Sequence, residues 1–525
     1  MPVGDGNIHY SSGNSLSFDR NRLRLAWYGL AVFLSSAILL VLEITAGRLI
    51  APYVGVTIYS WTSIIGVILA GLSLGNWLGG RWADRGADET STGIALALAA
   101  VSSLLGLWTL TVLAPWLQQS QLDLISASFL YVLGLFFVPA VLLGIPTPLL
   151  TTLALNLDRR TGHIVGRMHA LAALGSILGT FVTGFVLIQY FGSRLVVALA
   201  SAILLLLALP FLARASRKLW LLLLVLGAIS VALVQSGQGI ASPCDRESNY
   251  FCLRVIDASE RAPFGEARAL VLDHLLHGIN HRDAASMLIS PYVHLMQELV
   301  DQHFAADALP RLRYFFAGGG SYTQPRAIAS QHPEATIIVA ELDPLVTRTV
   351  EQFMYVDSGA FDVIHGDARA ALTRQPDASL DVIVTDAFHD IAIPYHLVTR
   401  EYAQLAKRKL RGNGIYTTNV VDAFPDPRMV KSMYNALRAE FAQVDIWIDH
   451  VPREPQRMTY VISASDSGAR QDRLVARRGF QRQWLRVNEP LARTGTPLNE
   501  LPLFTDDYVP VERMISSLLF SAEGR

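Results

Sequence analysis

The 525-residue chain has little cysteine and little charge. Its only cysteines, Cys244 and Cys252, are too few for a disulfide scaffold, and their spacing is not that of a metal site. Charged residues make up 17% of the sequence and the formal net charge is -1. No overall field would therefore attract nucleic acid, and we expect neither a nucleic-acid partner nor a bound metal.

A cleavable signal peptide is also missing, because the first twenty residues are polar and the first apolar run is too long for a signal core. The sequence is rich in apolar residues instead: 51% are hydrophobic, and the mean hydropathy is +0.34. That composition indicates a membrane protein, and the length allows two or three domains.

The N-terminal half consists of long apolar runs. A helix needs about 20 apolar residues to cross a bilayer, and seven runs meet this length: 25–50, 61–82, 93–113, 129–153, 164–190, 195–212 and 219–234. We therefore predict a transmembrane domain of seven helices over residues 25–235, in contact with the lipid bilayer of the cell (inner) membrane.

Basic residues lie almost entirely in alternate connections between these runs. They are Arg20, Arg22, Arg24, Arg81, Arg85, Arg159, Arg160, Arg167, Arg214, Arg217 and Lys218, whereas the other connections hold only Arg194. Because cytoplasmic loops carry an excess of Lys and Arg, the N-terminal tail, residues 1–24, is predicted to be cytoplasmic. Seven crossings would then leave the C-terminal half outside the cytoplasm.

The C-terminal half alternates strand and helix patterns. Two strand-like runs within a linker and small β subdomain, residues 236–310, precede a domain over residues 311–525. That domain contains five largely apolar strands with helical stretches between them, and two later strands extend the series. Apolar strands of this kind form a parallel sheet covered on both faces. We predict a doubly wound, Rossmann-like sheet of the class I methyltransferase type, with its ligand at the carboxyl ends of the strands.

Four strand ends in this domain carry candidate binding residues. Gly318, Gly319 and Gly320 close the first strand, and Glu341, Asp367 and Asp386 follow the next three. Each acid alone is more often a helix cap or a solvated loop residue. The glycines fit neither a triphosphate-binding loop nor a dinucleotide fingerprint. The three acids together favour a nucleoside without phosphate, such as S-adenosylmethionine, with Glu341 at the ribose.

The C-terminal half resembles the spermidine synthase (polyamine aminopropyltransferase) family. The matching stretches are "ESNYFCLRV", "LVLDHLLHG", "FAGGGSYTQPR", "VAELDP", "HGDARAAL", "DVIVTDAF" and "REYAQLAKRKLRGNGI". The N-terminal "LEITAGRLIAPYVG" and "GNWLGGRWADR" resemble the membrane-fused branch of that family. The resemblance implies that an amine attacks the carbon next to a sulfonium and that methylthioadenosine leaves.

The same resemblance implies roles for individual residues. Asp386 would take a proton from the amine, Asp367 would bind the adenine end, and Asp273 would line the pocket. Three positions depart from the family pattern: Ser321 replaces an aspartate that binds the aminopropyl amino group, His389 replaces a second acid, and His277 replaces a glutamine. Without the family's aspartate at position 321, the pocket would repel a substrate carboxylate less, which favours intact S-adenosylmethionine. The decarboxylated form stays open as a substrate as well.

Three functions compete. The first is a membrane-integrated transferase that acts on an S-adenosyl sulfonium, with a polyamine as one candidate acceptor. The second is a lyase, in which the substrate carboxylate attacks its own side chain and gives homoserine lactone and methylthioadenosine. The third is a non-catalytic sensor or ligand-gated transporter. A methyltransferase fits the sequence less well, and a homodimer stays open.

Cys244 and Cys252 are also predicted to form a disulfide. They lie together just after the last apolar run, on the side that the arginine distribution places outside. Disulfides persist in oxidising compartments, although two unrelated small apolar residues would explain the pair as well.

Overall fold

The computed structural model describes residues 13–86, 88–120, 122–387, 393–468 and 470–515. The chain divides into two compact units. The first comprises Met1–Leu49, Trp61–Trp116 and Phe129–Ser242, and the second comprises Ile50–Ser60, Leu117–Ser128 and Pro243–Arg525.

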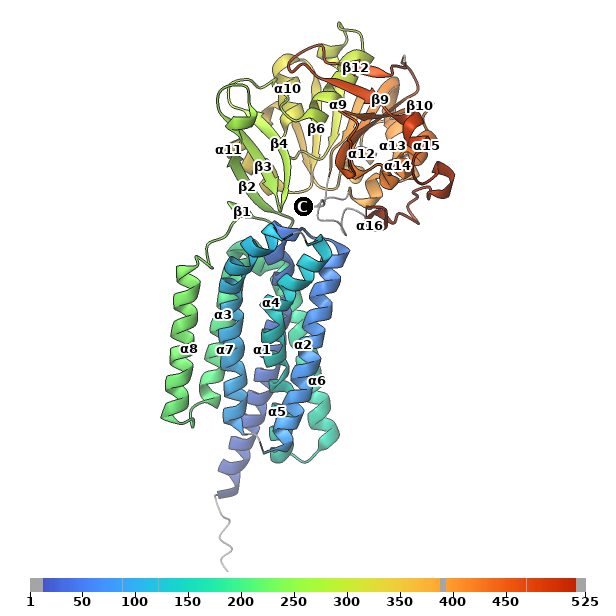
Figure 1. Ribbon diagram of the computed structural model, residues 1–525. Helices are drawn as coiled ribbons and strands as arrows, with labels where there is room; N and C mark the ends of the chain where they lie inside the picture. Colours follow the sequence, from blue (N-terminus) through green and yellow to red (C-terminus); the bar gives the residue numbers. More distant parts are fainter. Residues whose placement is uncertain (1–12, 87, 121, 388–392, 469, 516–525) are drawn as a thin grey trace, which may run out of the picture. The chain divides into compact units, whose positions relative to one another are not determined.

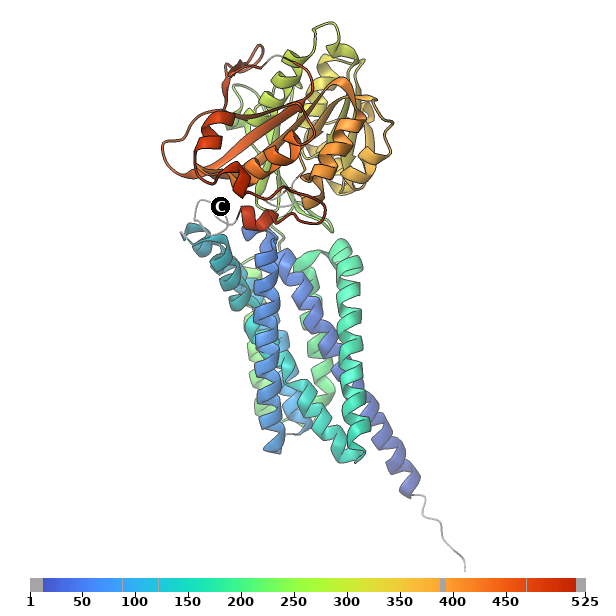
Figure 2. The same ribbon diagram turned by 90° about the vertical axis from the view of Figure 1, so that its right-hand side faces the viewer.

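Helices that run side by side build the first unit (Figures 1 and 2). They are α1 (Gly13–Val54), α2 (Ile58–Asp84), α3 (Glu89–Gln119), α4 (Leu124–Gly144), α5 (Pro146–Leu157), α6 (Thr161–Val182), α7 (Ile188–Phe211) and α8 (Arg217–Ser236), with a π-helical turn at Thr183–Leu187. Within the described residues, six helical stretches are long and apolar enough to cross a membrane. The helical N-terminal half predicted from the sequence is therefore present, with helices that could span a membrane by length and composition.

The described residues contain six such stretches, whereas the sequence predicts seven helices. The difference arises in one stretch. Thr161–Phe211 counts as one stretch of 51 residues, and an uninterrupted helix of that many residues would measure roughly 75 Å at 1.5 Å per residue. Gly192 interrupts it with φ 73° and ψ 159°, which no helical residue adopts. The predicted runs 164–190 and 195–212 lie on either side of this glycine, so seven crossings stay a prediction.

Glycines allow close approach between several of these helices. A Cβ atom on Gly75 of α2 would lie 2.0 Å from the carbonyl oxygen of Val141 in α4. A Cβ atom on Gly175 of α6 would lie 2.1 Å from the carbonyl oxygen of Phe33 in α1. Small residues at such crossings are typical of membrane helix packing, which explains Gly75 of "GNWLGGRWADR".

The second unit begins with a small antiparallel sheet. Its strands, in spatial order, are β1 (Arg246–Glu247), β2 (Cys252–Asp257), β3 (Ala267–Leu272) and β4 (Leu275–His281). Both strands predicted in this region are present as β2 and β3. A disulfide joins Cys244 to Cys252 at the start of β2, as the sequence predicts.

A nine-stranded sheet forms the rest of the unit, in the order β12-β13-β10-β11-β9-β8-β5-β6-β7. The strands are β5 (Arg313–Ala317), β6 (Thr336–Glu341), β7 (Asp362–His365), β8 (Leu380–Thr385), β9 (Leu410–Phe424), β10 (Gln443–Ile448), β11 (Gln456–Ser465), β12 (Arg473–Val475) and β13 (Gln483–Arg486). β5 to β9 are parallel, and β10 to β13 extend the sheet antiparallel. The two late strands of the sequence prediction are β10 and β11.

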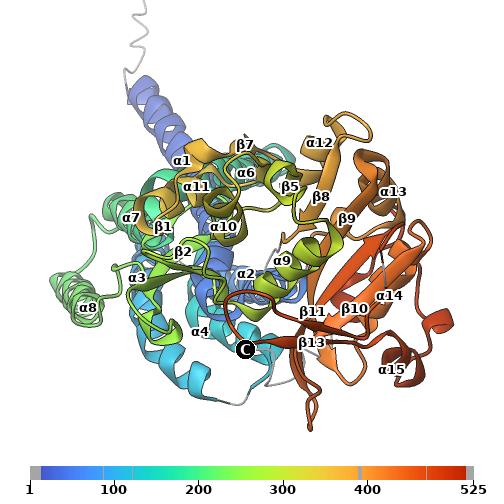
Figure 3. The same cartoon turned by 90° about the horizontal axis from the view of Figure 1, so that it is seen from above.

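Helices cover both faces of this sheet, which is why its central strands are apolar throughout. In Figure 3, α9, α10 and α11 lie on one face and α12, α13 and α14 on the other. These helices and the two short ones near the C-terminus are α9 (Pro291–His303), α10 (Thr323–Gln331), α11 (Pro344–Phe353), α12 (Ala368–Thr373), α13 (Arg400–Lys409), α14 (Arg428–Arg438), α15 (Asn488–Arg493) and α16 (Val511–Met514). The strand order reverses between β5 and β8, and ligands of doubly wound sheets bind at that point.

Candidate active site

A pocket opens at the carboxyl ends of β5, β6 and β8, and its empty volume is about 670 Å³. Its wall contains residues from every strand end that the sequence singled out. Among them are Gly318, Gly320, Glu341, Asp367, Asp386 and His277. These residues are far apart in the chain, and they meet because parallel strands end at one edge of the sheet.

The glycine loop fits closely against its neighbours. Gly318 has φ +99°, and a Cβ atom there would lie 2.3 Å from the carbonyl oxygen of Asp386. A Cβ atom on Gly319 would lie 2.5 Å from the ring of Tyr322. Tyr322 is buried, and its hydroxyl group hydrogen-bonds Thr347 at 2.8 Å. The loop therefore needs glycine for its own packing.

Glu341, at the end of β6, holds this loop in place. Its Oε2 atom accepts hydrogen bonds from the backbone N–H groups of Gly319 (2.9 Å) and Gly320 (3.2 Å). Oε1 accepts one from the N–H group of Asp343 at 2.9 Å. Burial raises the pKa of Glu341, and these three hydrogen bonds oppose that shift. Each carboxylate oxygen has two lone pairs, so one acceptor position is left, on Oε1.

Asp367 serves as a helix cap and also lines the pocket. Its Oδ1 atom accepts a hydrogen bond from the N–H group of Ala370 (2.8 Å) at the start of α12. Oδ2 lies 2.6 Å from Nε2 of His396, another residue of the pocket wall. Asp367 is therefore a helix cap, which the sequence analysis named as the more common role of such an acid. Capping occupies only one of its two carboxylate oxygens.

Asp386 follows β8 and is the carboxylate with the most perturbed environment in the pocket. Burial raises the pKa of Asp386 to about 6, and hydrogen bonds donated by Asn419 and Tyr292 limit the rise. The hydroxyl group of Tyr292 lies 3.4 Å from Oδ2. A carboxyl group with a pKa near neutrality suits the transfer of a proton from an incoming amine.

His277 and Ser321 lie beside each other at the edge of the pocket. Desolvation lowers the pKa of His277 to about 4, so its ring is neutral at physiological pH and lines the pocket without charge. Ser321 is buried, and its hydroxyl group lies 2.7 Å from that of Thr323. Ser321 is absent from the pocket wall because its side chain packs against Gly278 of β4.

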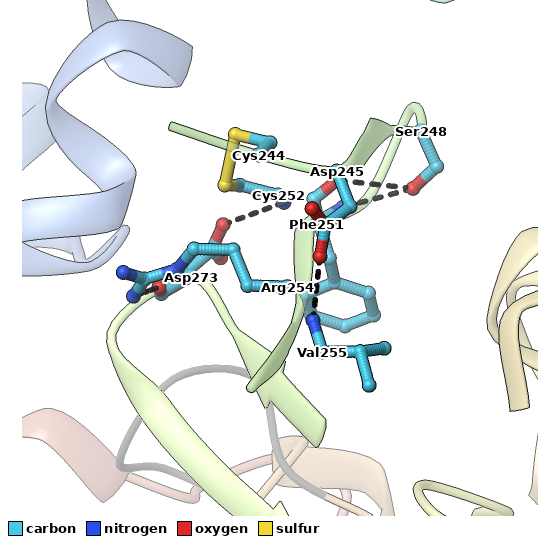
Figure 4. Close-up of a disulfide and its surroundings, with 8 residues drawn as sticks. All are labelled: Cys244, Asp245, Ser248, Phe251, Cys252, Arg254, Val255 and Asp273. Carbon is cyan, nitrogen blue, oxygen red and sulfur yellow. Dashed lines mark hydrogen bonds between the residues drawn. A yellow bond between two sulfur atoms is a disulfide. The ribbon is translucent and has the colours of Figure 1, made fainter. Parts of the chain in front are cut away.

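Asp273 lies in the turn between β3 and β4, with φ 52°. Its Oδ1 atom accepts a hydrogen bond from the N–H group of Cys252 at 2.9 Å, and its carbonyl oxygen accepts one from Arg254 at 2.8 Å (Figure 4). These contacts tie the turn to β2 and the disulfide, and Asp273 is not part of the pocket wall that the resemblance predicts for it. His389 lies outside the described residues.

The sequence analysis missed three residues of the site: Tyr292, His396 and Asn419. Asn419 could have been found, because its strand "GIYTTNV" is parallel to β8 and Thr418 pairs with Thr385 in register. Its side chain is buried, and its Oδ1 atom has no hydrogen-bond partner among the described residues. Tyr292 comes from α9, and no local signal relates it to Asp386, 94 residues later.

No group of three or more His, Cys, Asp or Glu side chains that could hold a metal ion occurs in the described residues. The pocket wall contains the carboxylates of Glu341, Asp367 and Asp386, which accept hydrogen bonds when ionised. Glu341 and Asp367 lie at the ends of the neighbouring strands β6 and β7, and the nucleoside expected from the sequence stays a prediction.

A doubly wound sheet of this order, with its pocket at the reversal point, has the Rossmann-like fold of class I methyltransferases. Residues 303–473 match the family model of the spermine/spermidine synthase domain, and this part of the chain is spermidine synthase-like.

Two curated relatives agree with this family. The chain is 35% identical over 105 residues to a polyamine aminopropyltransferase of Vibrio vulnificus (strain CMCP6), covering 19% of this chain and 34% of the relative. It is 27% identical over 103 residues to a probable polyamine aminopropyl transferase of Bifidobacterium longum (strain NCC 2705), covering 20% and 23%. The matched parts thus span about a third and a quarter of these relatives.

Among solved structures, a probable spermidine synthase from Corynebacterium glutamicum ATCC 13032 is similar, with 19% identity and a TM-score of 0.39. The match covers 54% of this chain and 96% of that one.

Proposed function

We propose that the C-terminal unit is a transferase that cleaves the sulfonium of an S-adenosyl substrate and passes its aminopropyl-type group to an amine. The single observation that carries this proposal is the position of Asp386, whose pKa is raised to about 6 in the wall of a pocket that also contains Glu341 and Asp367. Membership of a domain family named for spermine and spermidine synthases supports the same reaction class.

In the proposed reaction, the amine nitrogen forms a bond to the carbon next to the sulfonium. The carbon–sulfur bond breaks, its electron pair stays on sulfur, and methylthioadenosine leaves. The attacking nitrogen becomes positively charged as the bond forms, and its surplus proton passes to a carboxylate. Asp386 is proposed as that acceptor because its ionised form also stabilises the developing ammonium.

The remaining pocket residues are proposed to bind the nucleoside. Glu341 would accept a hydrogen bond from a ribose hydroxyl through Oε1 while Oε2 holds the glycine loop. Asp367 would accept one from the adenine amino group through the oxygen that now contacts His396. Gly318 and Gly320 would let the amino-acid part of the substrate pass close to the backbone.

A lyase is the second candidate, and the position of Ser321 favours it. The side chain at this position is a buried hydroxyl and carries no charge, and the neighbouring ring of His277 is neutral. Neither group would repel the carboxylate of intact S-adenosylmethionine. In the lyase reaction, a carboxylate oxygen of the substrate forms the new bond to carbon, so homoserine lactone and methylthioadenosine are released without an amine.

Product analysis tests these candidates. The purified full chain in detergent would be incubated with S-adenosylmethionine or its decarboxylated form, with and without putrescine or spermidine. Methylthioadenosine released only with an amine supports the transferase, and release without an amine supports the lyase. If wild type releases none with any combination while still binding the nucleoside, the protein is a non-catalytic sensor or transporter and the enzyme proposal fails.

We further propose that this unit lies outside the cytoplasm. The bias of Lys and Arg between the helices and the Cys244–Cys252 disulfide support that side independently. A reporter that is active only in the periplasm, fused after Arg525, tests it. Activity of a reporter that works only in the cytoplasm would overturn the proposed orientation.

A further inference from the structure

An apolar groove runs along the first unit between α3, α7 and α8, and its empty volume is about 1180 Å³. Ala97 and Leu104 of α3, Ala198 and Leu212 of α7, and Trp220 and Val231 of α8 mark its walls. The only hydroxyl groups in the wall belong to Ser201 and Ser230. Each donates to a carbonyl of its own helix, at 2.9 Å and 2.8 Å. The wall therefore suits a hydrocarbon occupant.

The groove has the length of one lipid chain. From Trp220 to Val231 it follows α8 for roughly 16 Å at 1.5 Å per residue. That is about half of the roughly 30 Å hydrocarbon core of a bilayer. α8 packs loosely over this distance, because only Leu223, Ser230 and Val234 of the helix are buried. An acyl chain of one leaflet would fill the space that this loose packing leaves.

Three cations surround the end of the groove at which α7 turns into α8. Arg214 lies two residues after Leu212, and Arg217 and Lys218 lie just before Trp220. All three side chains are exposed, and none makes a hydrogen bond or ion pair with another described side chain. Nearby Arg24 differs, because Glu89 lies 3.8 Å from it and offsets its charge.

We propose that this groove binds an anionic phospholipid, with one acyl chain between α3, α7 and α8 and the phosphate at Arg214, Arg217 and Lys218. Charge complementarity selects the anionic headgroup, because a Lys or Arg at the membrane surface contributes about 1 kcal/mol towards an anionic lipid. Trp220 lies between the cations and the apolar wall, at the level where indole rings prefer the membrane interface. The lipid would fasten α8, which leads directly to the second unit, to α3 and α7.

Native mass spectrometry of the full chain in detergent, titrated with phosphatidylglycerol or phosphatidylcholine, tests the headgroup. Wild type should bind phosphatidylglycerol more tightly. The triple variant Arg214→Gln/Arg217→Gln/Lys218→Gln should bind it at least about fivefold more weakly, which is the loss expected for a single cation. Arg159→Gln/Arg160→Gln removes charge from another basic loop and should leave the affinity unchanged. Equal affinity for both lipids, or equal loss in both variants, would overturn the headgroup site.

A second pair of variants tests the groove itself. Nothing lies within 4 Å of a Cβ atom placed on Gly227, which lines the groove. Gly227→Leu should therefore fold normally, fill the groove and weaken phosphatidylglycerol binding severalfold. Gly66→Leu, at an equally open position on α2, is the matched control and should bind as wild type. If Gly227→Leu bound lipid normally, or if it instead abolished a dimer seen with wild type, the groove would not be a lipid site.

Discussion

Tyr292 and Asp386 meet although 94 residues separate them, and the tyrosine hydroxyl group lies 3.4 Å from Oδ2 of Asp386. The contact joins the first turn of α9 to the end of β8. The contact changes the pKa of both groups. The hydrogen bond lowers the pKa of Asp386, whereas burial and the nearby carboxylate raise the pKa of Tyr292. The tyrosine therefore stays protonated, and its hydroxyl proton has two acceptors at 3.4 Å, Oδ2 of Asp386 and the carbonyl oxygen of His277.

Replacing Asp386 by Asn should abolish turnover and leave nucleoside binding intact. An amide of the same shape keeps the pocket but cannot accept a proton, and general-base catalysis contributes about 100- to 10,000-fold. The rate of methylthioadenosine release and the calorimetric affinity for the nucleoside would be compared with those of Asp377→Asn, an exposed control. Release at the wild-type rate would remove Asp386 from the mechanism.

Removing the hydroxyl group of Tyr292 should shift the pH profile of activity. The hydrogen bond stabilises the ionised form of Asp386, so Tyr292→Phe should raise the pKa of that carboxyl group. In wild type, kcat/KM should rise with pH through about 6, and in Tyr292→Phe the same rise should occur at higher pH. Tyr508→Phe, at an exposed tyrosine, should keep the wild-type profile. An unchanged profile in Tyr292→Phe would contradict the coupling.

Loss of the Glu341 carboxylate should weaken nucleoside binding. Removing a charged hydrogen-bond partner costs about 1.5–3 kcal/mol, and Glu341→Ala also frees the N–H groups of Gly319 and Gly320. Isothermal calorimetry with S-adenosylmethionine measures the change. Glu334→Ala removes an exposed acid outside the pocket and should bind normally. Equal affinities for the two variants would exclude Glu341 from the ribose site.

The glycine loop should tolerate no side chain at position 319. Gly319→Ala would force the ring of Tyr322 to move, because the new Cβ atom would lie 2.5 Å from it. Overpacking of this kind costs about 1–3 kcal/mol of unfolding free energy. Gly412→Ala is the control, since nothing lies within 4 Å of its Cβ position. Chemical denaturation followed by tryptophan fluorescence should separate the two variants, and equal stability would refute the proposed fit.

Asp386→Asn should also alter the pH dependence of stability. The pKa of Asp386 is raised to about 6 in the folded state, so the folded protein binds its proton more tightly than the unfolded chain does. Stability from this group is therefore present below its unfolded pKa and is lost as the pH rises through about 6, by about 1–3 kcal/mol. Thermal melting at pH 5 and pH 8 should show a smaller loss in the Asn variant than in wild type.

Reduction of the Cys244–Cys252 disulfide should destabilise the small sheet. A bridge with a sequence separation of 8 restricts the unfolded chain by about 2–3 kcal/mol. Cys244→Ser/Cys252→Ser should melt at a lower temperature than wild type, and reductant should lower the melting temperature of wild type alone. Mass spectrometry of non-reduced protein from intact, alkylated cells checks the bond itself. Two alkylated thiols would mean that the bridge does not form in the cell.

The sequence determined the elements of this protein and much of its site. Apolar runs of membrane length and short, largely apolar strands are local patterns, so they predicted the helical half, the parallel sheet and strands β10 and β11. Gly318, Glu341, Asp367 and Asp386 were found for a related reason. In a parallel sheet every strand ends at the same edge, so the last residues of successive strands meet without further knowledge of the packing.

Tertiary structure decided what these residues touch. Strand endings did not reveal that Glu341 holds the glycine loop, that Asp367 caps α12, or that Ser321 packs against Gly278, because such contacts depend on side-chain directions across elements. Tyr292 lies on a helix face and His396 in a loop. No pattern in the sequence shows that either residue lies near the pocket. The sequence predicted a break between the runs 164–190 and 195–212, and the structure shows that Gly192, with φ 73°, lies at this break. Local patterns determine which elements form, and only packing fixes the neighbours of each side chain.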